Sequence, residues 1–134
     1  MKLEWRAVLT GAAVDLGSSA FFCGVVWIGF AAILSAGGSS TKEIYAALYS
    51  SGFAAVLLCF GLSFNALGGF VSASIAGRRH LLFGALSAAP CFMLSLFRLL
   101  DPLPTYFPIW SFLAGWFLSV PFGMLGGLVA SKRA

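Results

Sequence analysis

The chain has very little charge. Of its 134 residues, only 9% are Asp, Glu, Lys or Arg, whereas 60% are hydrophobic and the mean hydropathy is +1.00. Because a soluble domain has about 25% charged residues, this composition excludes an ordinary soluble fold. The polar and apolar alternation over segments of about ten residues that is typical of a membrane β-barrel is also missing. The composition therefore indicates a helical membrane protein.

Residues that carry out chemistry are equally scarce. The chain has one histidine, His80, and its three cysteines, Cys23, Cys59 and Cys91, all lie in apolar stretches, where we expect them to pack as small apolar groups. It has no HExxH sequence, no pair of aspartates within apolar stretches and no phosphate-binding loop. The segment GLSF at 61–64 matches a serine protease motif only loosely and has no histidine to act as base. The sequence therefore predicts a non-enzymatic protein without a metal or cofactor.

Four apolar stretches are long enough to cross a bilayer. A transmembrane helix needs about 20 predominantly apolar residues. Such stretches extend over about residues 7–34, 51–76, 81–99 and 108–130. Few residues remain outside them, so we expect a single transmembrane domain over 1–134, folded as an all-α four-helix bundle.

The basic residues are distributed unevenly between the two sides of this bundle. Six would lie on one side, at Lys2, Arg6, Arg78, Arg79, Lys132 and Arg133, and two on the other, at Lys42 and Arg98. Because Lys and Arg accumulate on the cytoplasmic side, both termini are predicted to be cytoplasmic, in the inner membrane of a bacterium. The residues expected at the cytoplasmic headgroups are Arg78, Arg79, His80, Lys132 and Arg133. The net charge of +4 follows from the same bias, and no nucleic-acid partner is expected.

Short internal matches indicate a duplicated helical hairpin. FNALGGFVSA at 64–73 recurs as FGMLGGLVAS at 122–131, and RAVLTGA at 6–12 recurs as RHLLFGA at 79–85. The second and fourth stretches each contain small residues at every fourth position: Gly61, Asn65, Gly69, Ala73 and Gly77, then Gly115, Ser119, Gly123, Gly127 and Ser131. Small residues permit close helix contact in lipid, where no hydrophobic force draws helices together. We expect both rows to pack helices, and the second row to contact another copy of the chain.

One acidic residue, Asp15, lies inside an apolar stretch. Counted from the nearest basic residue at 1.5 Å per residue, Asp15 is about 13 Å deep and Asn65 about 20 Å deep from the same side. The two residues lie on adjacent antiparallel helices, so a modest tilt of the helices is predicted to let their side chains meet. The equivalent positions of the second hairpin hold Ala88 and Gly123. Since both polar groups are absent there together, we expect Asp15 and Asn65 to act as a pair.

Two interpretations of Asp15 lead to different functions. In the first, a protonated carboxyl group hydrogen-bonds to Asn65, Ser18 or Ser19 and fixes helix register in an assembly or accessory protein. In the second, Asp15 is a proton or cation site in a small transporter or channel. Transport needs further polar groups on both sides, and fragments of such a path are Ser63, Ser72, Ser87, Ser111 and Ser119. We prefer the first interpretation and keep transport as the alternative. The expected partners are lipid and either a second copy or another membrane protein.

The segment LGGFVSASIAGRRHLLFGAL at 67–86 resembles the glycine-rich second helix and loop of small bacterial four-span membrane proteins of unassigned function. This resemblance implies the same fold and assigns no role to any residue. The chain is also similar to small multidrug exporters in its size and in the acid of its first stretch. Those exporters have glutamate where this chain has Asp15, and they insert in both orientations. The uneven distribution of Lys and Arg contradicts dual insertion here.

Overall fold

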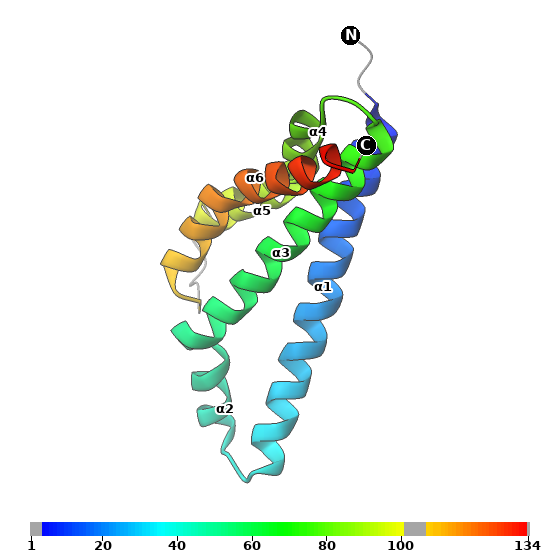
Figure 1. Ribbon diagram of the computed structural model, residues 1–134. Helices are drawn as coiled ribbons and strands as arrows, with labels where there is room; N and C mark the ends of the chain where they lie inside the picture. The colour runs from blue at the N-terminus through cyan, green and yellow to red at the C-terminus, as the bar shows by residue number, and fades with distance from the viewer. Residues whose placement is uncertain (1–3, 101–106, 134) are drawn as a thin grey trace.

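The computed structural model describes residues 4–100 and 107–133, and 88% of these are helical, with no strand among them. Four segments are long and apolar enough to cross a membrane. They are α1 (Trp5–Ala36), α3 (Ser51–Ala76), the pair α4 (His80–Ser87) and α5 (Ala89–Leu100), and α6 (Ile109–Ser131). The chain is therefore a multi-pass helical bundle, as the sequence predicts (Figure 1). Lys2, which contributes to the predicted orientation, lies outside the described residues.

A short helix, α2 (Thr41–Leu48), lies in the connection between the first two spans and was not predicted. Its start is a capping box, because the Glu43 backbone N–H donates to Ser40 Oγ while the Ser40 N–H donates to the Glu43 carboxylate. The Ser40 hydroxyl also donates to that carboxylate at 2.8 Å. These bonds hold the pKa of Glu43 below its usual value. The sequence Ser-Thr-Lys-Glu at 40–43 matches the pattern that is typical of a capping box.

The third span is divided at Ala88, where α4 ends and α5 begins. Pro90 lies two residues beyond the break and has no N–H to donate to the preceding turn, which interrupts the helix. Pro121 lies inside α6, and that helix continues through it. Because of this break, the positions of the α5 side chains around the helix axis do not continue those of α4.

Both described ends of the chain lie at one end of the bundle, beside the loop between α3 and α4 (Figure 1). We call this the basic end because it holds Arg6, Arg78, Arg79, Lys132 and Arg133, and we call the opposite end the α2 end. Helices α3 and α6 pack extensively against each other, with α1 against α3 and α4 against α6. From the basic end towards the α2 end, α1 and α3 separate (Figure 1).

Glycine backbones bring the helices together near the basic end. A Cβ atom placed on Gly11 of α1 would lie only 2.6 Å from the Gly68 carbonyl oxygen of α3. The same close approach joins α3 to α6 and α4 to α6, through the pairs Gly69 with Gly123, Gly126 with Ala66, and Gly84 with Gly123 and Gly127. Any larger residue at these positions would collide with backbone atoms. This half of the bundle is therefore packed backbone against backbone.

Two glycines expected to pack helices do not do so. A Cβ atom on Gly61 or Gly77 would have no neighbouring atom within 4 Å, so the prediction for these residues is wrong. Gly77 instead ends α3 with a left-handed φ of 62°. Positions four apart rotate by about 40° around a helix, so the ends of a row leave the contact. A Cβ atom placed on Gly115 would make only ordinary contacts, the nearest at 3.6 Å to the Ser95 hydroxyl oxygen.

The row on α6 is occupied within the chain. Ser119, Gly123 and Gly127 are buried, and Gly123 and Gly127 lie against the backbone of α4. This face is consequently not available for the contact with another copy that the sequence suggested. Self-association through a different surface stays a prediction, as does the duplication of the hairpins.

Towards the α2 end, aromatic side chains replace glycine between α1 and its neighbours. The ring pairs are Phe22 with Phe60, Phe30 with Phe53, and Trp27 with Tyr49, at centroid distances of 4.3, 5.0 and 6.3 Å. Because the distance between helix axes depends on the side chains at the contact, these pairs hold α1 farther from α3 than the glycines do. The bundle is narrow at the basic end and wider towards the α2 end.

Two substitutions in α3 test this description. We expect Gly69→Ala to lower the free energy of unfolding by about 1–3 kcal/mol, because its Cβ meets the Gly123 carbonyl group. Gly61→Ala is the matched control and should be neutral, since open space surrounds it. Denaturant unfolding in mild detergent measures both. An equal loss of stability at the two positions contradicts the description.

Candidate functional site

An open cavity of about 440 Å³ lies between α1, α3, α5 and α6, on the α2 side of the glycine contacts. Its walls are mostly apolar, with leucines from α1, α3 and α5 and the rings of Phe107 and Phe112. The lining residues nearest the glycine contacts are polar or contain sulfur: Ser19, Asn65, Cys91 and Ser119. Gly61 and Gly115 also line the cavity, so the two small-residue rows border it where they no longer pack helices.

Asp15 lies directly behind this polar end of the cavity. It is 1% exposed, and its Oδ2 atom accepts a hydrogen bond from the Cys91 thiol at 3.1 Å. Cys91 and Ser19, one turn along α1 from Asp15, both line the cavity, whereas Asp15 itself does not. Within the described part of the chain, Asp15 Oδ1 has no hydrogen-bond partner.

Asn65 lines the cavity but does not bond to Asp15. Its Nδ2 atom donates to the Gly61 carbonyl group of its own helix at 3.3 Å, and it is 5% exposed. Its Oδ1 atom has no partner among the described residues. The direct hydrogen bond expected from the sequence is therefore not formed, although both side chains lie at the same end of the cavity.

Two buried acceptor atoms thus remain without a donor at one end of an open cavity. Most buried polar atoms in proteins have a partner, because leaving one unpaired costs about 1–3 kcal/mol. Such a group calls for an explanation, and a bound ion, water or ligand is the usual one. Asn65 lines the cavity, and Asp15 is bonded to Cys91, which also lines it.

The side of Asp15 towards the basic end is closed. Ser72 and Ser87 flank Gly11 there and are 0% and 1% exposed. Beyond them, an apolar cluster joins α1, α3 and α4 through Ala7, Val8, Ala76 and Phe83. An ion pair of 2.9 Å between Glu4 and Arg78 lies outside this cluster. In this structure the carboxyl group is approached from the α2 side.

The five serines proposed as path fragments fall into three groups. Ser111 and Ser119 line the cavity, and Ser72 and Ser87 are buried on the closed side. Ser63 is exposed on α3 and donates to the Cys59 carbonyl group, so it does not belong to a path.

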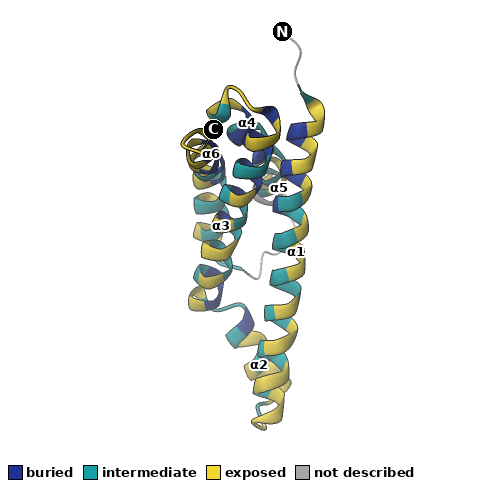
Figure 2. Cartoon of the chain, turned by 45° about the vertical axis from the view of Figure 1, so that its right-hand side comes forward, coloured by how far each residue is buried: buried dark blue, intermediate teal, exposed yellow. Residues whose placement is uncertain are grey.

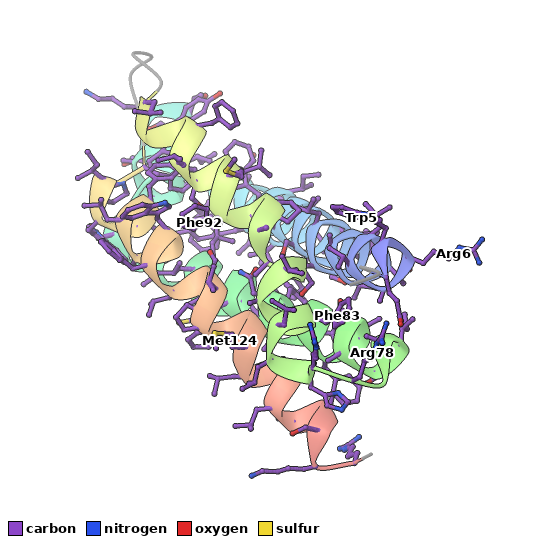
Figure 3. All side chains as sticks on the ribbon, turned by 90° about the horizontal axis from the view of Figure 1, so that it is seen from above. Trp5, Arg6, Arg78, Phe83, Phe92 and Met124 are labelled. Atoms are coloured by element: carbon purple, nitrogen blue, oxygen red, sulfur yellow. The ribbon has the colours of Figure 1, made fainter. Side chains whose placement is uncertain are left out.

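At the basic end, Arg78, Arg79, Lys132 and Arg133 are exposed, which suits contact with headgroups. Figure 3 shows Arg6 at the same end, pointing away from the bundle. The Arg133 guanidinium group lies 5.5 Å from the centre of the Phe70 ring. His80 differs from its neighbours, because it is half-buried and its Nδ1 atom is buried without a partner among the described residues. His80 is thus partly packed against the bundle, and its contact with headgroups stays a prediction.

Cys91 is the site residue that sequence reasoning missed. It was expected to pack as a small apolar group, and it is instead a hydrogen-bond donor to Asp15. Cys59 was also expected to be buried, and it is exposed. No spacing pattern in the sequence connects Cys91 with Asp15.

No protein-family model, curated protein or solved structure matches the chain. The fold and the site together define a multi-pass helical membrane protein with an open cavity and a buried carboxyl group beside it.

A double-mutant cycle tests the bond between Cys91 and Asp15. We expect Cys91→Ala and Asp15→Leu to be coupled by about 0.6–1.7 kcal/mol in the free energy of unfolding, the range for interhelical hydrogen bonds in membranes, because neither product can form the bond. Unfolding in mild detergent supplies the four values. Cys59→Ala is the control, because this exposed thiol should show no coupling to Asp15. Additive effects of Cys91→Ala and Asp15→Leu contradict the assignment.

Proposed function

We propose that this protein is a small, non-enzymatic transport protein of the bacterial inner membrane, in which Asp15 binds the transported proton or cation. The observation that carries the proposal is the open cavity that ends at the side chains around the Asp15 carboxyl group, whose Oδ1 atom has no partner in the described chain. Acidic residues inside membrane spans are rare and typically mark a proton or ion pathway.

The contacts of Asp15 favour transport over a purely structural role. A carboxyl group that served only to fix helix register would be expected to bond through both oxygens to strong donors. Here the interhelical donor is a thiol, which is weak, and one oxygen is unpaired. The helices are already held by glycine contacts on the closed side. Packing therefore gives no reason for an acid at this position.

The charge bias supplies the orientation of the proposed cycle. With the basic end in the cytoplasm, the cavity lies on the periplasmic side of the glycine contacts. The apolar cluster and the ion pair between Glu4 and Arg78 then close the cytoplasmic side. Transport requires a second state in which this end opens and the cavity closes, by rocking of one hairpin against the other.

Flux measurements on purified protein in liposomes test the proposal. We expect a gradient of protons, Na⁺ or K⁺ to drive flux above that of empty liposomes, reported by an enclosed ion-sensitive dye. Asp15→Asn should abolish this flux and leave the fold intact, because the amide cannot bind a proton or neutralise a cation. Glu43→Gln is the control, since it removes an exposed acid remote from the cavity. Flux at the empty-liposome level for all three cations, or full flux in Asp15→Asn, contradicts the proposal.

Helix α1 supports an assembly role as a second candidate function. All its buried residues lie between Ala7 and Asp15, and none of the residues from 16 to 36 is buried (Figure 2). One face of this part of the helix, with Phe21, Val25, Ile28 and Ile33, thus offers an apolar surface that is not covered within the chain. A second copy of the chain is the partner that this surface is proposed to bind.

Photo-crosslinking in liposomes tests this second candidate. A photoreactive residue at Phe21, which is 76% exposed on α1, should give a covalent dimer. The same residue at Phe117, which is 64% exposed on α6, should not. Absence of a dimer from Phe21, or equal dimer from both positions, shows that lipid covers α1.

A further inference from the structure

The basic end holds five exposed cations and one acidic side chain among its described residues. The acid is Glu4, and its ion pair with Arg78 joins the start of α1 to the loop between α3 and α4. Helices α3, α4 and α6 contain no Asp or Glu at all. A negative charge that balances the cations at the end of α6 must therefore come from outside these helices.

A backbone contact places two groups of these cations at one junction. A Cβ atom on Gly127 would meet the His80 carbonyl oxygen, so the start of α4 lies against the last turns of α6. Arg79 directly precedes His80, and Lys132 and Arg133 directly follow the end of α6. We call Arg79, Lys132 and Arg133 the α4–α6 basic patch. Its cations come from segments that are distant in the sequence.

The two arginines of the patch define the kind of anion that suits it. The Arg133 guanidinium group lies 5.5 Å from the centre of the Phe70 ring, and this cation–π contact holds it on the α3 side of the α6 end. Arg79 offers a second guanidinium group at the start of α4. A guanidinium group binds phosphate through two parallel N–H bonds, whereas lysine acts as a point charge. Two arginines on two segments therefore suit two phosphates.

Apolar residues adjoin the patch on the side that faces the membrane interior. Leu128 and Val129 lie one turn before Lys132 and Arg133, on the same faces of α6, and both are exposed. On α4, the exposed residues Leu81 and Leu82 follow shortly after Arg79. Because these residues belong to membrane spans, hydrocarbon covers them. A ligand of the patch therefore has acyl chains next to its phosphates.

We propose that the α4–α6 basic patch binds one membrane phospholipid that carries two phosphate groups, with Arg79 and Arg133 each binding one phosphate. A lipid with one phosphodiester brings a single negative charge to three cations, whereas two phosphates balance them more closely. Anionic headgroups attract every Lys and Arg at a membrane surface. The patch differs because it holds one lipid at one place, where it bridges α4 and α6. This inference is independent of the proposed transport function.

Lipids matched in their acyl chains test the ligand class. The probes are diphosphatidylglycerol, phosphatidylglycerol and phosphatidylethanolamine, all with oleoyl chains, and native mass spectrometry of the protein in neutral detergent measures their binding. We expect one diphosphatidylglycerol to bind at least about fivefold more tightly than phosphatidylglycerol, because each Lys or Arg at a surface contributes about this factor to the binding of an anionic lipid. Phosphatidylethanolamine should bind most weakly. Equal binding of the two anionic lipids overturns the proposal.

A soluble anion distinguishes a lipid site from a general phosphate site. Inorganic pyrophosphate has two linked phosphates and no acyl chains. At the same concentration as diphosphatidylglycerol it should not displace the lipid, because the apolar residues beside the patch contribute to binding. Displacement by pyrophosphate at that concentration overturns the assignment to a lipid.

Three variants that each remove one positive charge locate the lipid. Arg133→Ala and Arg79→Asn should each weaken diphosphatidylglycerol binding about fivefold. Asn is chosen because Arg79 has a φ of 47°, which Asn tolerates. Arg6→Ala is the matched control, since Figure 3 shows Arg6 at the same end of the bundle, on α1, pointing away from the bundle and from the end of α6. Its effect should be smaller than about twofold, because salt screens distant charges.

The comparison of these variants decides between one site and a general attraction. Equal weakening by Arg6→Ala and Arg133→Ala shows that only net charge matters and overturns the site. Unchanged binding in Arg133→Ala or Arg79→Asn overturns it as well. Gel filtration and circular dichroism establish that each variant is folded, so that a loss of binding reports the lost contact.

Discussion

Contact between helix backbones near the basic end is the constraint on which the rest of the bundle depends. In lipid, apolar side chains gain little by moving from lipid to protein, so helices associate through close van der Waals contact. Gly69 and Gly123 provide this contact between α3 and α6, and Gly11 and Gly68 provide it between α1 and α3. The position of every span at this end is therefore set by where the chain has glycine.

The cavity follows from the change of contact residues along the spans. Glycine pairs hold α1 and α3 together at one end, and the pair Phe22 with Phe60 holds them farther apart beyond it. Asp15 lies where the contact changes, with its Cβ atom against Gly68 and its carboxyl group beside the cavity. A larger residue at Gly68 would displace Asp15, so the glycine contact also positions the acid.

The spans could be predicted from the sequence because length and hydropathy determine them. The residues that make the contacts between helices could be predicted only in part. A search for small residues at every fourth position finds Gly69, Gly123 and Gly127, but it follows one face of each helix. Adjacent residues point about 100° apart, so a glycine doublet serves two neighbours. Gly68 contacts α1 while Gly69 contacts α6, and Gly126 contacts α3 while Gly127 contacts α4. The doublets at 68–69 and 126–127 were the stronger signal.

The site was predictable to a similar degree. Asp15 stands out because an acid within a span is costly, and Asn65 because the second hairpin lacks both polar groups. Cys91 could not be placed, since the break at Ala88 gives α5 a register that the preceding helix does not determine. Which oxygen of Asp15 has no hydrogen-bond partner depends on where this register of α5 places Cys91. The inference that a ligand binds there rests on that unpaired oxygen.

The same contacts determine how the bundle can change shape. The surface between α3 and α6 at Gly69 and Gly123 consists of backbone atoms, which present no long side chain to interlock the helices there. A change of crossing angle at such a contact keeps the backbones in touch while it moves the far ends of the helices. The cavity lies towards those far ends, between α1, α3, α5 and α6. A small rotation about the glycine contact therefore changes the width of the cavity, and Asp15, next to the pivot, moves least.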